Sequence, residues 1–228
     1  SEMWSLTALE FLDLNGNELE GDLSSSIGNL TNLQVLDLGN NGWTGDLPSS
    51  IFDLTQLREL WLLNGGFSGS FDASLGNLVN LEILAVGGNL FSGPIPAEIG
   101  NLTNLYWYYD YGNDWSGALP AAFFDLPITR ITLGFSPLIQ GELPTGFQNF
   151  TDLEELRIFV NDLSTSGLPS WVGDFANLQT LNINDCDLGP DPVLPAFINN
   201  LNNLTNLSIG QIDWVGYEAD TLDLESLK

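Results

Sequence analysis

The stretch "NLVNLEILAVGGNLFSGPIPAEIG" (residues 77–100) decides how this chain folds, because nearly the same line recurs along the sequence. Corresponding apolar residues lie 24 positions apart through the first seven units, and the spacing then becomes 25 and 26. The units start near Leu6, Leu30, Leu54, Leu78, Leu102, Leu126, Phe150, Phe175 and Leu201, with a truncated tenth from Leu224. A fixed period of this length is typical of repeat architectures, so we expect residues 1–228 to form a single domain of about nine stacked repeats.

Each unit predicts one short strand followed by a return segment. Each unit contains a Leu-x-Leu motif, written L-x-L, such as Leu36 to Leu38. Its leucines alternate with other residues, as in a strand, and the asparagine, glycine and proline that follow it indicate a turn and a non-strand return. One unit cannot bury its apolar residues alone, so neighbouring units stack with their strands about 4.8 Å apart. The sequence therefore predicts a solenoid with one long parallel sheet.

At this point the chain resembles the leucine-rich repeat family, specifically the plant-type 24-residue class of polygalacturonase-inhibiting proteins and receptor-kinase ectodomains. The residues that carry this resemblance are "NLTNLQVLDLGNNGWTGDLPSSI" (29–51) and the stretch quoted above, and it covers nearly the whole chain. It implies an α/β-type solenoid, a right-handed superhelix with the parallel β-sheet on its concave face and loop or 3-10 returns on its convex face. It also implies a secreted or cell-surface module that recognises its ligand through the sheet.

The composition is that of a folded but strongly acidic protein. There are 30 Asp plus Glu against 4 Lys plus Arg, a formal charge of −26, while 43% of the residues are hydrophobic. Such a charge argues against nucleic acid and anionic membrane surfaces as partners, since both are polyanions. A cationic partner, divalent cations and a salty environment remain open. No stretch approaches the roughly 20 apolar residues of a membrane span.

Several conspicuous residues are explained by the repeat itself. Cys186 falls in the asparagine slot of its unit, so we expect a buried structural thiol. The asparagines of that slot should bond backbone groups of neighbouring turns. The slot holds Asn17, Asn41, Asn89, Asn113 and Asn161, and the large apolar position two residues later, expected in the core, holds Trp43, Phe67, Phe91, Trp115 and Trp214. The chain has no histidine and no metal-ligand cluster, so we expect no enzyme, no cofactor and no metal site.

Two surface patterns also follow the repeat. Asn-x-Ser/Thr triplets, which are acceptors for N-glycosylation in a secretory pathway, begin at Asn29, Asn101, Asn149, Asn203 and Asn206. A threonine column, which is a distant indication of ice binding, contains Thr7, Thr31, Thr55, Thr103 and Thr151. Both patterns arise from the repeat's own boundary sequence, and Val79 interrupts the threonine column.

The residues between and beside the leucines of L-x-L should point out of the concave face, where no core requires them. In repeats 3 to 7 these positions are unusually aromatic, and side chains one strand apart on one face are close enough to touch. We therefore predict a ligand-binding patch in the middle of the concave face. Its residues are Trp61, Leu63, Ile83, Trp107, Tyr109, Tyr111, Arg130, Phe135, Arg157 and Phe159.

The role of the arginines in this patch has two interpretations. Arg130 and Arg157 lie in the outward columns and Arg58 flanks them, although the chain has only four basic residues. They either pair with glutamates of the sheet or form a fork for a carboxylate or sugar hydroxyl of a ligand.

Asp110 is the residue that fits the repeat least. It stands at an inward position where Leu38, Leu62 and Val86 stand in other units. A buried lone carboxylate is costly, and it would have a raised pKa or a bound partner. We expect instead a local bulge that turns Asp110 outward.

The sequence thus favours a recognition module whose concave face binds a protein or peptide. A carbohydrate is the second hypothesis, because flat aromatic rings stack on sugars and Asn182 and Asn184 have groups that bond hydroxyls. Exposed solenoid ends also make end-to-end self-association possible.

Overall fold

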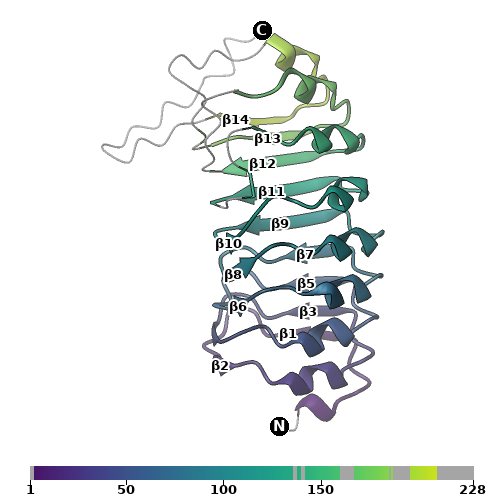
Figure 1. Cartoon of the computed structure of the whole chain (residues 1–228), viewed down its shortest axis with the longest axis vertical. Coiled ribbons are helices and arrows are strands. Elements are labelled where there is room, and N and C mark those ends of the chain that lie inside the picture. The colour runs from purple at the N-terminus through teal and green to yellow at the C-terminus, as the bar shows by residue number, and fades with distance from the viewer. Residues whose placement is uncertain are drawn as a thin grey trace, which may run out of the picture.

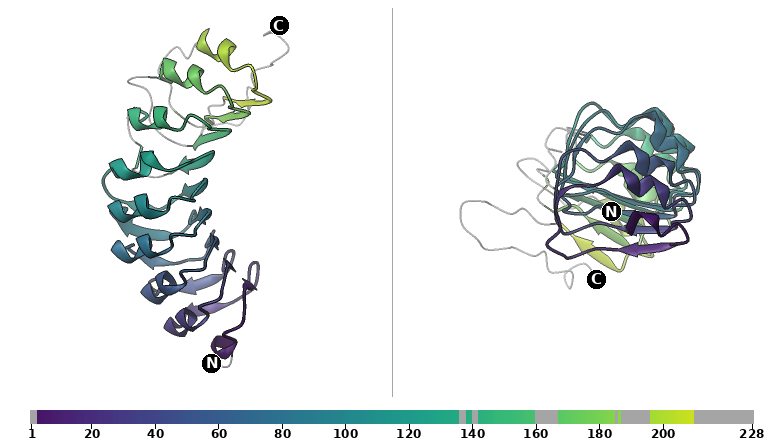
Figure 2. Two further views of the ribbon diagram at one scale, coloured as in Figure 1. Left: turned by 90° about the vertical axis from the view of Figure 1, so that its right-hand side faces the viewer. Right: turned by 90° about the horizontal axis from the view of Figure 1, so that it is seen from below.

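The computed structural model describes residues 3–135, 138–139, 142–159, 167–184, 186 and 196–209. Within these residues the strands stack one above the next along the long axis of the molecule (Figure 1). The resulting body is a crescent with the main sheet on its inner side and short helices on its outer side (Figure 2). This is the solenoid that the 24-residue period predicts.

The concave face is a nine-stranded parallel sheet with one strand per repeat. Its order is β1-β3-β5-β7-β9-β11-β12-β13-β14, so neighbours in the chain are neighbours in the sheet. The strands are β1 Phe11–Asp13, β3 Val35–Asp37, β5 Glu59–Trp61, β7 Ile83–Ala85, β9 Trp107–Tyr111, β11 Arg130–Gly134, β12 Glu155–Phe159, β13 Thr180–Asn182 and β14 Asn206–Ser208.

The register of this sheet confirms the outward columns expected from the sequence. Across the sheet the first column pairs Phe11, Val35, Glu59, Ile83, Trp107, Arg130, Glu155, Thr180 and Asn206. The second column pairs Asp13, Asp37, Trp61, Ala85, Tyr109, Thr132, Arg157, Asn182 and Ser208. No strand is shifted by one residue against its neighbour. Such a shift would turn all of its leucines from the core to the solvent, so burial of the leucines fixes the register.

The convex face consists of 3-10 turns, and the described residues contain no α-helix. Most of these turns follow a proline, serine or aspartate that starts the helix in an extended conformation. They are η1 Met3–Ser5, η2 Ser25–Asn29, η3 Ser49–Asp53, η4 Ala73–Asn77, η5 Ala97–Asn101, η6 Ala121–Asp125, η7 Thr145–Asn149, η8 Ser170–Asp174 and η9 Ala196–Asn200.

The return segments differ from the sequence expectation, because five of them contain a second short strand. These strands are β2 Glu20–Asp22, β4 Gly42–Thr44, β6 Ser68–Gly69, β8 Leu90–Gly93 and β10 Asp114–Trp115. They form a two-stranded sheet, β2-β4, and a three-stranded sheet, β10-β8-β6. The return segments stack with the same period as the strands, so their backbone groups come into register. Because buried N–H and C=O groups require hydrogen-bond partners, neighbouring returns pair as short strands.

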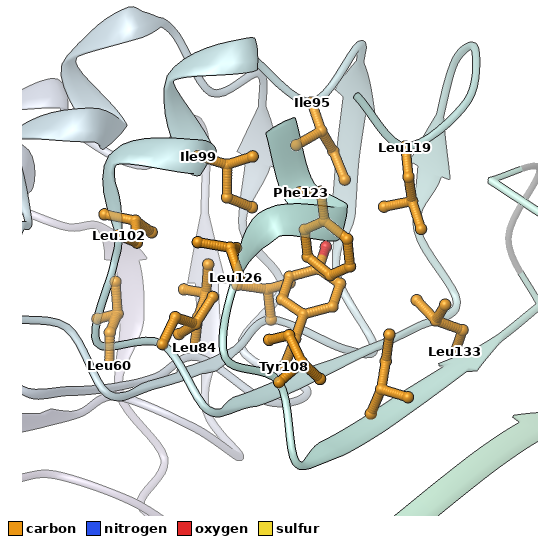
Figure 3. Packing of buried hydrophobic residues seen from close by; sticks show 14 of the residues in the cluster. Leu60, Leu84, Ile95, Ile99, Leu102, Tyr108, Leu119, Phe123, Leu126 and Leu133 are labelled. Carbon is orange, nitrogen blue, oxygen red and sulfur yellow. The ribbon is translucent and has the colours of Figure 1, made fainter. Parts of the chain in front are cut away.

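The core lies between the main sheet and the 3-10 turns, and it consists of one row of leucines per repeat position. Figure 3 shows part of it, where Tyr108 of β9 and Phe123 of η6 approach each other with ring centroids 5.1 Å apart. A second row is aromatic: the rings of Trp43, Phe67, Phe91 and Trp115 stack from repeat to repeat with centroids 5.6 to 6.5 Å apart. The expected core placement of these four residues is confirmed, and Trp214 lies outside the described residues.

The asparagine ladder is confirmed where it is described. The Asn89 amide donates to the carbonyls of Leu62 and Val86 at 2.8 Å, and its Oδ1 accepts from the backbone N–H groups of Gly65 and Phe67. Cys186, in the same slot, is buried as expected, and its Sγ donates to the carbonyl of Ile158 at 3.4 Å. Asn161 lies outside the described residues.

None of the described helices is long and apolar enough to cross a membrane. The division into nine complete units and a tenth from Leu224 stays a prediction, since residues 210–228 are not among those described.

Candidate functional site

The structure brings the predicted patch residues together on one face and in the middle of the sheet. They lie in β5, β7, β9, β11 and β12, which are consecutive strands of the sheet, or directly beyond the ends of β5 and β11. The most aromatic of these strands is β9, from which Trp107, Tyr109 and Tyr111 point to the concave side while Tyr108 and Asp110 point inward. We call Trp61, Trp107, Tyr109 and Tyr111 the aromatic platform.

The two tryptophans of the platform touch across an intervening strand. The ring centroids of Trp61 and Trp107 are 5.3 Å apart in an edge-to-face arrangement, although β7 lies between their strands. This is possible because β7 presents Ala85, whose small side chain is fully buried. Ile83, the other outward residue of β7, is only 6% exposed. The expectation that Ile83 is an exposed contact residue is therefore wrong, since its larger neighbours cover it.

Tyr111 crosses the same strand in the same way. Its hydroxyl donates to Oδ1 of Asn64 at 2.8 Å, two strands away. Beneath the ring lies Gly87, where a Cβ atom would stand 2.3 Å from Tyr111. The glycine at this position therefore allows the tyrosine to lie flat on the sheet instead of projecting from it.

On its other side the platform continues toward β11 and β12. Thr132, which stands between Tyr109 and Arg157 in the register, is fully buried. Burial raises the pKa of Tyr109, the neighbouring Tyr111 raises it further, and the positive charge of Arg157 opposes this shift. The Oγ1 of Thr132 and the Nε1 of Trp107 are buried and have no hydrogen-bond partner among the described residues.

All three arginines pair with glutamates that lie in the sheet or directly precede one of its strands. Arg58 bonds Glu82 through Nη2 at 2.7 Å, Nη2 of Arg130 lies 3.7 Å from Glu154, and Arg157 bonds Glu155. The Cζ of Arg130 also lies 5.6 Å from the ring centroid of Trp107, which is within the range of a cation–π contact. Of the two interpretations from the sequence, the structure shows internal pairing.

Phe135 is the most exposed of the predicted residues. It follows β11 with 51% of its surface accessible, and its backbone has a φ of +47°. A left-handed conformation is unfavourable for a bulky residue, and asparagine adopts it more easily; Asn40 and Asn64 have φ values of +50°. Neither burial nor backbone geometry thus accounts for a phenylalanine here.

The remaining two predicted residues border the platform. Leu63 follows β5 and Phe159 ends β12, and both are half-buried. Their side chains extend the apolar surface toward the ends of the strands.

Asp110 does not form a bulge, and that expectation is wrong. It pairs in register with Leu133 of β11, and its side chain is completely buried under the platform. The carboxylate accepts hydrogen bonds from Asn113 Nδ2 at 2.7 Å and from the Tyr108 hydroxyl at 3.3 Å. Asn113 belongs to the asparagine ladder of the other repeats too, whereas the Tyr108 hydroxyl is a polar partner that the leucine-filled repeats lack; together they make the buried position possible.

Burial raises the pKa of Asp110 to about 6, and the hydrogen bonds from Asn113 and Tyr108 oppose this shift. Burial also raises the pKa of Tyr108 well above its usual value, and the nearby carboxylate adds to that effect. The sequence did contain the signal for this cluster, because Tyr108 and Asp110 replace apolar residues at two inward positions of a single repeat.

The chemical groups of the site are those of a binding surface. It offers flat apolar rings, paired charges and buried donors. Within the described part of the chain, no group of three or more His, Cys, Asp or Glu residues stands in a position to hold a metal ion.

The parallel sheet of one strand per repeat, the 3-10 returns and the asparagine ladder define a class of protein: this chain has the leucine-rich repeat fold, and it is similar to plant-type members of that class. The model of the leucine-rich repeat region family matches residues 1–107. No curated protein sequence matches the chain.

Solved structures of repeat proteins match nearly the whole chain. A TDR receptor is 27% identical with a TM-score of 0.75, and the match covers 90% of this chain and 36% of that one. The ectodomain of the Arabidopsis thaliana membrane receptor kinase GASSHO1/SCHENGEN3, solved with CASPARIAN STRIP INTEGRITY FACTOR 2, is 29% identical with a TM-score of 0.74, covering 91% and 24%.

The similarity extends beyond plants. The Leptospira interrogans repeat protein LIC12759 is 30% identical with a TM-score of 0.73, and the match covers 91% of this chain and 52% of that protein. The chain thus spans between about a quarter and half of the length of these three structures.

Proposed function

We propose that this chain is an extracellular recognition module that binds a peptide or protein partner through the middle of its concave face. The observation that carries the proposal is the aromatic platform. Its four rings are half-buried on the sheet, whereas the core is already filled by the leucine rows and the stacked aromatic row beneath.

The platform has the properties of a preformed binding surface. The contact of Trp61 with Trp107 and the bond from Tyr111 to Asn64 fix three of its rings without a ligand. Rings that are already ordered lose little conformational freedom on binding, which favours affinity. Tryptophan, tyrosine and arginine are also the residues most enriched in interface hot spots.

Two further features favour binding over a purely structural role. An exposed Phe135 in a left-handed conformation costs stability, and so do the unpartnered groups of Trp107 and Thr132. Costs of this kind concentrate at functional sites. All three residues belong to the same central surface.

The relatives support a ligand of this kind. The GASSHO1/SCHENGEN3 ectodomain was solved in complex with CASPARIAN STRIP INTEGRITY FACTOR 2, and another matching structure, 26% identical, is the complex of PEPR1 with AtPEP1. An ectodomain faces the outside of the cell, which supports the extracellular location proposed for this chain.

Carbohydrate binding is the alternative that the same rings support. It is less favoured because the polar neighbours are engaged with one another: Asn182 Oδ1 accepts from the Asn184 backbone, and Asn184 Oδ1 accepts from Ser208. Ice binding by the threonine column is the least favoured alternative, since the exposed side chain of Val79 interrupts the column.

The test is a double substitution, Trp107→Ala with Tyr109→Ala. Wild type and variant are screened in parallel against a displayed random-peptide library and a glycan array. We expect the wild type to enrich peptides and the variant to enrich none. Enrichment on the glycan array alone would favour the carbohydrate alternative, and a variant that binds as the wild type does would refute the concave-face proposal.

A further inference from the structure

We infer that the partner is a basic peptide segment in which a lysine or arginine stands about three residues from an aromatic or large apolar side chain. This inference rests on the proposed function, because it names the ligand of the same concave face. It depends on the charges that the face leaves unpaired and on their distance from the platform.

The positive charges of the face are already occupied. Arg58, Arg130 and Arg157 each form an ion pair with a glutamate in the sheet or directly before one of its strands, so within the described residues every arginine has a carboxylate partner. An acidic ligand would have to break one of these pairs, in a chain with a formal charge of −26. Charge complementarity therefore disfavours an anionic partner.

The negative charges next to the platform are not neutralised. Asp13, Asp37 and Glu59 lie in the outward columns of β1, β3 and β5, and no arginine of the described residues bonds them. Asp13 and Asp37 stand directly opposite each other in the register. Like charges in opposite positions repel, so a cation placed between or above them is favourable.

Neutral hydrogen bonds hold these carboxylates in position. Asp37 accepts from Asn15 Nδ2 at 3.1 Å and from the backbone N–H of Gly39 at 2.9 Å. Glu59 accepts from the indole Nε1 of Trp61 at 2.9 Å. The bond from Trp61 to Glu59 joins these carboxylates directly to the aromatic platform.

The spacing of the two parts sets the spacing expected in the ligand. Asp37 lies on β3, and the paired rings of Trp61 and Trp107 meet over β7, two strands farther on. Two strand separations amount to about 10 Å, and an extended peptide advances about 3.3 Å per residue. An extended segment that crosses the sheet therefore spans the distance with about three residues.

The experiment selects ligands without presuming their sequence. A random twelve-residue peptide library on phage is panned on the full chain, and the enriched peptides are synthesised together with versions in which Lys and Arg become Glu. We expect enriched peptides to be basic, with a cationic and an aromatic or apolar residue about three positions apart. The Glu versions should lose binding, and higher salt should weaken the parent peptides.

Matched variants separate the charge inference from the proposed function. Asp37→Asn with Glu59→Gln removes two charges while keeping oxygen acceptors, and we expect at least a tenfold loss of affinity. The control, Asp53→Asn with Glu98→Gln, removes two exposed charges from η3 and η5 on the convex side and should change affinity less than twofold. Circular dichroism and the melting temperature of each variant check that it folds.

The outcomes are distinguishable. Enrichment of acidic or uncharged peptides, or an unchanged affinity for Asp37→Asn with Glu59→Gln, would overturn the basic-partner inference. If those same peptides fail to bind Trp107→Ala with Tyr109→Ala, the proposed function survives. If they still bind that variant, or if no peptide is enriched over an unrelated protein, both proposals are overturned.

Discussion

Replacing Asp110 with Asn should stabilise the protein at neutral pH and hardly at all in acid. The carboxyl of Asp110 is buried, and its pKa is raised from 3.8 to about 6. The native state therefore holds this proton more tightly than the unfolded chain does. Stability from this group is fully present below about pH 4 and is lost as the pH rises through 6.

The size of the effect follows from the shift. A difference of about two pKa units corresponds to about 3 kcal/mol in the free energy of unfolding. About half of this free energy, roughly 1.5 kcal/mol, is lost as the pH rises from about 5 to 7.5. This pH range lies above the isoelectric point of the chain. The amide of Asn has the shape of the carboxyl and does not titrate, so the pH-independent effects of the substitution cancel in the comparison.

The assay is urea unfolding of wild type and Asp110→Asn at several pH values across this range. Tryptophan fluorescence and circular dichroism should give the same transition, which checks that the repeats unfold together. Asp125→Asn, at an exposed position that ends η6, is the control. We expect the advantage of Asp110→Asn over wild type to grow by about 1.5 kcal/mol from pH 5 to 7.5. An advantage that stays constant with pH would refute the buried, proton-holding carboxyl.

Three more substitutions test other parts of the argument. Tyr108→Phe removes a hydrogen bond to the Asp110 carboxylate, so the pKa of Asp110 should rise further and the pH dependence of unfolding should move upward; an unchanged curve would contradict the contact. Asn89→Ala leaves buried carbonyl and N–H groups of the ladder without partners and should cost about 2 to 4 kcal/mol in urea unfolding; a loss below 1 kcal/mol would argue against the ladder's structural role. Phe135→Asn introduces the residue found at Asn40 and should raise the unfolding free energy by about 1 kcal/mol while weakening peptide binding; a loss of stability would show that the phenylalanine serves the fold.

The local sequence predicted the scaffold because the repeat imposes the same environment on every unit. Leu60, Leu84 and Leu156 point inward, and the outward columns follow from the side-chain period of two. The second strands of the returns were missed, since their pairing comes from stacking and not from any pattern in L-x-L.

The candidate site was predicted in position but not in conformation. The sequence identified β9 as the aromatic strand, yet it predicted an exposed Ile83 and an outward Asp110. The first error concerns contacts between different repeats, and the second concerns the hydrogen bonds of Asp110 with Tyr108 and Asn113 of its own repeat. Whether a ring projects or lies flat depends on the size of the residue on the next strand, such as Ala85 or Gly87, and on partners still farther along the chain.

The sequence by itself determined the repeat, the sheet, the register and the large negative charge of this protein, because each of these depends on residue type at a fixed period. Only the tertiary structure decided that the arginines are paired and that the platform lies flat. It also decided that Asp110 is buried with polar partners. These features depend on distances between side chains, within one repeat for Asp110 and between repeats for the platform, and a pattern of residue types does not contain those distances.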